Sequence, residues 1–291
     1  MSKKTADKTE DKCAELRTRI PELPKIMRKQ NWIIGAELME EWLRRGANYR
    51  PEIAIPNTDI VQMDWVLSFP RAAKAYQAAI DKKVWLSEKA QERIFRALIR
   101  GKVSLPSAAG EKVKFGNIGE GLTRSSDMKQ FHKNWQIQFY EFAQNPVMDP
   151  LDDLYAALGD FYFYYLVEGW VERLPDENDK PRYKATITRV GVYVMDSYDF
   201  NDINPETNKP NTGVRAFHLR RPFGSVALSQ PLGNWSCKNN SASKFPLKDY
   251  YYVRNIDFRD WREDYGKGRG GDFLVFSDIK VFDTNDSFML P

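Results

Sequence analysis

Two long β-rich runs that flank one polar turn constrain the fold of this chain more than any other feature. The first run, 160–173, contains FYFYYLV at 161–167, and the second, RYKATITRVGVYVMD at 182–196, is rich in β-branched residues. The polar turn PDENDK at 175–180 separates them. Aromatic and β-branched runs on either side of a short turn are typical of a hairpin. The sequence therefore predicts a long antiparallel hairpin over 160–196, which ends in an exposed loop at 197–204.

The chain before residue 131 has a helical pattern. In KIMRKQNWIIGAELMEEWLRRGAN, residues 25–48, apolar side chains recur at i, i+3 and i+4, and Gly46 is a plausible stop. Trp32 and Trp42 lie in this pattern, which favours a place in the core for both. Further helices are expected at 59–80 and 86–100.

The second of these helices carries recognisable end signals. Ser87 precedes the helical pattern and is a typical N-cap residue, and Gly101 follows it at a typical C-terminal position. We therefore expect this helix to begin after Ser87.

Strand patterns dominate the remainder. NWQIQFYEFAQ at 134–144 alternates apolar and polar residues, and a final strand pair is expected from YYYVRNIDF at 250–258 and GDFLVFSDIKVFD at 271–283. The predicted fold class is α+β, with a helical N-terminal part followed by an antiparallel β-sheet or half-barrel.

The expected organisation has three parts. Residues 1–20 are polar and Lys-rich and are expected to form a disordered tail. Residues 21–130 form the helical region, and residues 131–291 form the antiparallel β domain.

Composition narrows the class of protein. A chain of 291 residues with 42% hydrophobic residues can bury a sizeable core without cross-links. The formal charge of +4 is too small to indicate nucleic-acid binding. Cys13 and Cys237 lie at opposite ends of the chain and suggest no disulfide framework, which fits a reducing cytosol. We expect no export signal and no membrane span, because the N-terminus is charged and FYFYYLV is too short to cross a bilayer.

Histidine is scarce, and this limits the available chemistry. His132 and His218 are the only two, and none of the common zinc, P-loop or nucleophile-elbow motifs occurs. His132 is interpreted as a structural residue at the start of the 134–144 strand. The segment GKGRGG at 266–271 has glycines and two cations that could hold a phosphate, but it lacks the P-loop setting and is interpreted mainly as a turn.

The segment VMDSYDFND at 194–202 concentrates acidic residues at the end of the hairpin. Asp196, Asp199 and Asp202 are spaced three apart, and such oxygen ligands could hold Mg²⁺ or Ca²⁺. The alternative is a solvated turn rich in Asp and Asn, which the pattern alone favours. FHLRR at 217–221 adds a histidine and cations, either for an anionic substrate or as a solvated face.

From residue 159 onward the chain resembles the catalytic domain of the colicin M family of bacteriocins. The resemblance rests on GDFYFYY, MDSYDFN and DFLVFSDIKVF, which occur in the order that this family shows, and it covers less than half of the chain. It implies a β-rich domain and Mg²⁺-dependent cleavage of lipid II between the undecaprenyl carrier and the pyrophosphate.

The resemblance also implies site residues. Asp196, Tyr198 and Asp199 match the loop of the family directly, and the two aspartates would be the metal ligands. The family has a His-Arg pair shortly after this loop. Here the nearest equivalent is His218 with Arg220, which Leu219 separates and which follows an apparent insertion.

A second resemblance covers more of the chain. GAELMEEWLRRGAN, VGVYVMDSYDF and QPLGNW are similar to an uncharacterised bacterial family that is often encoded beside type VI secretion genes. It implies a protein that is cytoplasmic in the producing cell and enters the periplasm of a target cell without a signal peptide. A secretion-system component and an immunity protein would then be its partners.

Three functions follow as hypotheses. The first is an antibacterial effector, a toxin that hydrolyses lipid II and blocks peptidoglycan synthesis. The second is a non-enzymatic type VI secretion adaptor or chaperone that binds a toxin through an aromatic sheet. The third is a structural binding module.

Overall fold

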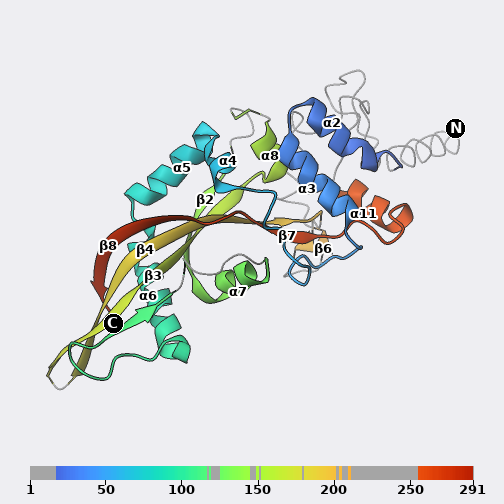
Figure 1. Cartoon of the computed structure of the whole chain (residues 1–291). Coiled ribbons are helices and arrows are strands. Elements are labelled where there is room, and N and C mark those ends of the chain that lie inside the picture. Colours follow the sequence, from blue (N-terminus) through green and yellow to red (C-terminus); the bar gives the residue numbers. More distant parts are fainter. Residues whose placement is uncertain are drawn as a thin grey trace, which may run out of the picture. The chain divides into compact units, whose positions relative to one another are not determined.

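A computed structural model of the chain shows an α+β fold (Figure 1). It describes residues 18–116, 118, 125–144, 149–150, 152–178, 180–200, 203–204, 209–210 and 255–290. Helices dominate the N-terminal part, and an open antiparallel sheet of six strands forms most of the remainder. The predicted fold class is confirmed.

The chain forms two compact units, and each is assembled from three separate segments. The first unit takes Met1–Ala54, Ala143–Asp160 and Ser197–Leu274. The second takes Ile55–Phe142, Phe161–Asp196 and Val275–Pro291.

The regular structure of the first unit consists mostly of short helices. These are the 3-10 turn η1 (Ile20–Glu22), α2 (Leu23–Lys29), α3 (Ile33–Arg44), α8 (Asp153–Ala157) and α11 (Asn255–Asp264), together with the two-stranded pair β5 (Ile203–Asn204) and β6 (Lys209–Pro210). The expected helix at 25–48 is in fact two helices, because Asn31 adopts φ 60° and breaks the helical path. Trp32 and Trp42 are buried as predicted, with 4% and 0% of their surface exposed.

The start of α3 is capped from a distant part of the chain. Its N-cap residue, Trp32, has no side chain that can accept a hydrogen bond. Instead Asp153 of α8 accepts from the backbone N–H groups of Ile34 at 2.9 Å and Gly35 at 2.8 Å. Asp153 thereby satisfies two of the unpaired amides that begin every helix, and it fixes α8 against α3.

The second unit contains the other helices of the described chain. These are α4 (Met63–Leu67), α5 (Pro70–Asp81), the 3-10 turn η2 (Val84–Leu86), α6 (Glu88–Ala97), the π-helical turn η3 (Leu98–Lys102) and α7 (Ser125–Trp135). The predicted cap of α6 is confirmed, because Ser87 Oγ accepts from Ala90 N at 3.3 Å. No helix in the described part of the chain is long and apolar enough to cross a bilayer.

The sheet is built around the predicted hairpin. Its strands are β1 (Lys112–Phe115), β2 (Gln136–Phe142), β3 (Phe161–Glu177), β4 (Lys180–Tyr198), β7 (Phe273–Phe276) and β8 (Lys280–Met289). β3 and β4 pair along almost their whole length, with β1 and β2 on the free side of β3, and β7 and β8 on the free side of β4. The register shifts between Glu168 and Gly169, where β4 has an extra residue, and again between Leu174 and Glu177 near the turn.

The two faces of β3 differ in what covers them. Phe163 and Tyr165 lie on one face and contact Tyr76 of α5 and Trp85 of η2. Tyr164 points to the other face, where His132 of α7 packs edge-on against it at 4.8 Å. Figure 1 shows α5 and α7 on opposite sides of the hairpin. The strand alternation therefore places a helix on each face of the sheet.

Two local predictions were wrong. The segment 255–258, expected to be a strand, begins helix α11; the preceding residues of that predicted strand lie outside the described residues. His132 lies in α7 and not at the start of a strand, because this helix continues to Trp135 before β2 begins.

Candidate functional site

Three of the five residues suggested by the sequence lie at the end of the hairpin. Asp196 and Tyr198 belong to the last residues of β4, and Asp199 follows directly. His218 and Arg220 lie outside the described residues. The site can therefore be built from Asp196, Tyr198 and Asp199 and from what surrounds them.

Tyr198 and Phe200 anchor this segment in an aromatic cluster. The two residues are each 8% exposed. Phe200 stacks on Phe258 of α11 at 3.9 Å and meets the edge of Trp42 at 4.9 Å, while Tyr198 packs on Phe273 at 5.4 Å. The prediction of an exposed loop is thus wrong for these two residues, because their rings are needed to fill the core of the first unit.

Asp199 lies between these two residues in the sequence and is half-buried. Ser197 Oγ donates to Asp199 Oδ2 at 2.5 Å, and Asp199 N donates to the Ser197 carbonyl at 3.0 Å. With Tyr198 and Phe200 fixed on either side, these bonds leave the carboxylate little freedom. Such restraint is what a catalytic or ligand-binding group requires.

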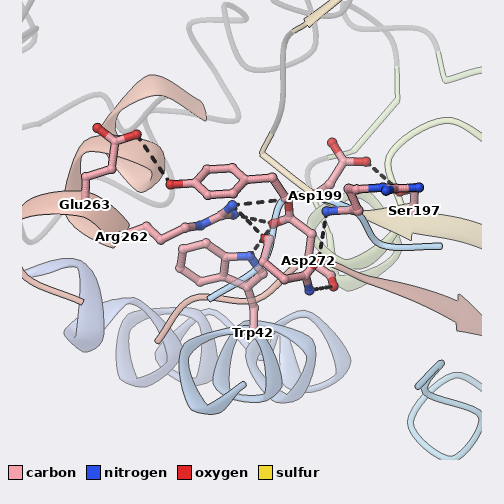
Figure 2. A network of polar contacts seen from close by, with 9 residues as sticks. Trp42, Ser197, Asp199, Arg262, Glu263 and Asp272 are labelled. Atoms are coloured by element: carbon pink, nitrogen blue, oxygen red, sulfur yellow. Dashed lines mark hydrogen bonds and ion pairs between the residues drawn. The ribbon is translucent and has the colours of Figure 1, made fainter. Parts of the chain in front are cut away.

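A buried ion pair lies close to Asp199 (Figure 2). Asp272 and Arg262 are joined by two hydrogen bonds, and their side chains are 0% and 1% exposed. Trp42 Nε1 donates to Asp272 Oδ1 at 2.8 Å, and Arg262 Nη1 donates to the Asn48 carbonyl at 2.8 Å. The network ties α3, α11 and the strand β7 to one carboxylate.

Burial raises the pKa of Asp272 above its ordinary value, although the hydrogen bond from Trp42 and the charge of Arg262 act in the opposite direction. The negative charge of Asp199 adds to the increase. Asp199 is thus near enough to the buried network to affect its protonation.

The glycine-rich segment 266–271 is a turn, as the sequence predicted. The N–H groups of Gly266, Arg269, Gly270 and Gly271 donate to backbone carbonyls of Trp261, Gly266, Arg45 and Trp42 in that order. Gly270 has φ +91°, and a Cβ there would lie 2.9 Å from Trp42. These four amides donate to the protein itself and are therefore not directed at a ligand, as the amides of a phosphate-binding nest would be.

Asp196 is near a second group of residues, in the second unit. Burial raises the pKa of Tyr164 to about 12, and the charges of Asp196 and Tyr162 contribute. Tyr164 stacks on Tyr193, whose hydroxyl lies 2.7 Å from His132 Nδ1. The structural interpretation of His132 fits these contacts.

Sequence reasoning did not find Asp272 or Arg262. Both lie near the glycine-rich turn, and no local motif marks them as buried. Their partner Trp42 is 230 residues from Asp272 along the chain. Only the spacing of Phe258, Trp261 and Arg262 on one helical face could have indicated a buried side of α11.

The acidic residues could hold a metal ion only if water or substrate supplied most of its ligands. Within the described ranges, no three His, Cys, Asp or Glu side chains come together as a ligand set. Mg²⁺ often takes one or two carboxylates and completes its shell with water and substrate phosphate. Asp199, held by Ser197, meets that minimum.

The fold and this segment define an α+β protein in which a half-buried acidic residue, Asp199, lies next to a buried ion-pair network in the first unit. The chain belongs to a family of unknown function, DUF6402, whose pattern matches residues 18–290. No curated protein and no solved structure matches the chain.

Proposed function

We propose that the protein is an antibacterial effector that hydrolyses a polyprenyl-linked pyrophosphate, lipid II, in the periplasm of a target cell. The observation that carries the proposal is the restrained carboxylate of Asp199, which lies between two buried aromatic residues and accepts a hydrogen bond from Ser197. The resemblance of GDFYFYY and MDSYDFN to the colicin M family supplies the substrate class and the Mg²⁺ requirement.

Each residue of the segment has a defined role in this proposal. Asp199, with Asp196, would hold Mg²⁺, which supplies charge neutralisation of the pyrophosphate when bound. Ser197 orients the Asp199 carboxylate through its hydroxyl group. Tyr198 is a positioning residue, since its ring is packed against Phe273 and holds the backbone that carries Asp199.

His218 and Arg220 complete the proposed site. His218 would move a proton, and Arg220 would stabilise the negative charge that develops on the leaving pyrophosphate. A type VI secretion system would deliver the protein, and an immunity protein would protect the producing cell.

The test compares wild type with Asp199→Asn in release of pyrophosphoryl disaccharide-pentapeptide from purified lipid II with Mg²⁺. Asparagine keeps the shape and removes the charge, so activity should fall by at least about a hundredfold while the melting temperature changes little. The matched control is Asp64→Asn, the same change at a side chain that is 87% exposed.

Two results would count against the proposal in different ways. A wild-type protein without activity on lipid II would remove the hydrolase function. An active wild type that Asp199→Asn matches would leave the function standing and remove this site. His218→Ala, run beside them, tests the weaker part of the site separately.

A second function, a type VI secretion adaptor or chaperone for a toxin, is favoured by a different observation. Phe139, Tyr162 and Trp170 of the sheet are 44%, 38% and 43% exposed. Phe139 meets Tyr162 edge-on at 5.3 Å, so two of the rings form a contiguous apolar surface. Exposed aromatic residues of this kind are enriched where proteins bind other proteins.

The adaptor function is tested by co-purification with a large toxin encoded next to the gene. Phe139→Ser and Tyr162→Ser should each weaken the complex. Val281→Ser, at a residue that is 39% exposed on β8, is the control for loss of apolar surface in general. Equal loss with all three variants would argue against a specific aromatic surface.

A further inference from the structure

An open groove of about 440 Å³ in the first unit carries a concentration of positive charge. It lies between α2, α3 and the glycine-rich turn, and its lining includes four cations, one carboxylate and an apolar residue: Lys25, Arg28, Arg44, Arg269, Glu40 and Leu43. Like charges that line one depression repel each other, and a bound anion or an internal counter-charge offsets this repulsion.

Part of this charge is compensated within the protein. Arg28 forms a two-pronged ion pair with Glu40, with the Nη2–Oε2 distance at 2.8 Å. Arg44 pairs with Glu41, a residue of the same helix. These two arginines are therefore held in place and still present N–H groups along the groove.

The other two cations are not compensated. Within the described ranges, neither Lys25 nor Arg269 has an ion-pair partner. Arg269 Nε donates to the Gly266 carbonyl at 3.4 Å, which leaves its two Nη atoms without a described partner. The turn at 266–271 is fixed to α3 through Gly270 and Gly271, so Arg269 is attached to a rigid base.

We propose that this groove binds a phosphate-bearing anion, with Lys25 and Arg269 as its principal contacts. A guanidinium group with open Nη atoms matches the oxygens of a phosphate, and a nearby ammonium group adds a second charge. Leu43 gives the groove an apolar side, which suits a phosphate carried on an organic group. The proposal does not depend on the hydrolase function, because it uses none of the residues around Asp199.

The first experiment measures binding of inorganic pyrophosphate to the full-length protein by titration calorimetry at low salt. The second measures co-sedimentation with phosphatidylcholine vesicles that contain phosphatidic acid, against vesicles of phosphatidylcholine alone. Lys25→Glu/Arg269→Glu should weaken either kind of binding by at least about tenfold, because it removes two charged hydrogen-bond donors. Lys25→Gln/Arg269→Gln tests the same contacts with a smaller change of charge.

The matched control is Lys89→Glu/Arg100→Glu, which makes the same change of charge at two exposed residues of α6 and η3. It should leave binding within about twofold of wild type, since neither residue lines the groove. Binding of pyrophosphate alone assigns the groove to a soluble anion, and binding of phosphatidic acid vesicles assigns it to a lipid headgroup. Absence of both, or equal loss in the control variant, overturns the proposal.

Discussion

Arg262 and Asp272 form the most deeply buried ion pair in the described part of the chain. Their charges have been taken out of water, and the cost is recovered only while both partners and the hydrogen bonds from Trp42 and to Asn48 are present. The guanidinium also lies over the rings of Trp42, at 5.2 Å, and Tyr49, at 4.4 Å. Removal of one partner should therefore lower the free energy of unfolding more than removal of both charges.

We expect Arg262→Met to lower the free energy of unfolding by about 3–5 kcal/mol, because it leaves the carboxylate of Asp272 buried without its cation. The double variant Arg262→Met/Asp272→Asn should recover part of this loss, since asparagine is neutral and still accepts from Trp42. Urea unfolding of the three proteins measures the difference. Arg50→Met, which breaks a pair with Glu52 at 69% and 53% exposure, should cost at most about 1 kcal/mol.

A double variant less stable than Arg262→Met would contradict this account of the pair. It would mean that the hydrogen bonds of Asp272 matter more than its charge.

At the scale of single residues, the sequence located the acidic segment but not its surroundings. The spacing of Asp196, Tyr198 and Asp199 was visible as a local pattern. The burial of Tyr198 was not, because it depends on Phe273, far along the chain. The burial of Asp272, which follows the glycine-rich turn, also depends on residues far away in the sequence, such as Trp42.

The cap that Asp153 supplies to α3 is the first prediction at the scale of elements. Asp153→Ala leaves the amides of Ile34 and Gly35 without their acceptor and should cost about 1–2 kcal/mol. Asp153→Asn should recover only part of this loss, because its one amide oxygen can accept one of the two hydrogen bonds and its Nδ2 cannot accept the other. Burial also raises the pKa of Asp153, so a neutral side chain avoids a desolvation cost.

Chemical unfolding at pH 7 distinguishes these variants. Equal losses for Asp153→Asn and Asp153→Ala would contradict this expectation and show that one remaining acceptor does not stabilise α3.

The stability of the folded protein should depend on pH because of His132 in helix α7. Burial lowers the pKa of His132 below its ordinary value of 6.5. The unfolded chain therefore takes up the proton first as the pH falls below 6.5, and the folded state loses stability from that point downward. Unfolding free energies measured from pH 7.5 to pH 5 should fall more steeply for wild type than for His132→Gln, which keeps a polar partner for Tyr193.

His218 is the only other histidine of the sequence, so His218→Gln is the natural control for titration. Parallel curves for wild type and His132→Gln would exclude His132 as the source of the pH dependence.

The elements themselves were predicted unevenly, for physical reasons. The hairpin followed from two long β-rich runs, and the N-cap at Ser87 followed from a local rule. α11 was missed because the tyrosines at 250–252 dominate the pattern that precedes it. From Asn255 onward the helical spacing of Phe258, Trp261 and Arg262 prevails, since it buries one side of the helix.

At the scale of the whole molecule, the proposed effector function predicts in which compartment of a bacterial cell the protein is toxic. Directed by an added signal peptide to the periplasm of a susceptible bacterium, it should stop growth, because the headgroup of lipid II faces that compartment. Kept in the cytosol, it should not. Growth curves after induction measure the difference, with Asp199→Asn as the inactive form.

Equal toxicity in both compartments, or none in either, would count against an effector that acts on lipid II. Toxicity that Asp199→Asn retains would point to a different site in the same protein.

The α+β class was predictable because helical and strand periodicities occupy different stretches of the sequence. The composition of the two units was not, because local periodicity carries no information about which distant segments pack together. Each unit takes three segments from separate parts of the chain.

The hydrogen bond between Trp42 and Asp272 has a consequence for the order of synthesis. A ribosome makes Asp272 230 positions after Trp42. The buried centre of the first unit therefore cannot form until Asp272 has been synthesised, and the apolar faces of its early helices lack these partners until then. Contacts between residues this distant in sequence slow folding and prolong the exposure of apolar surface. The nascent chain should therefore depend on chaperones that bind during translation.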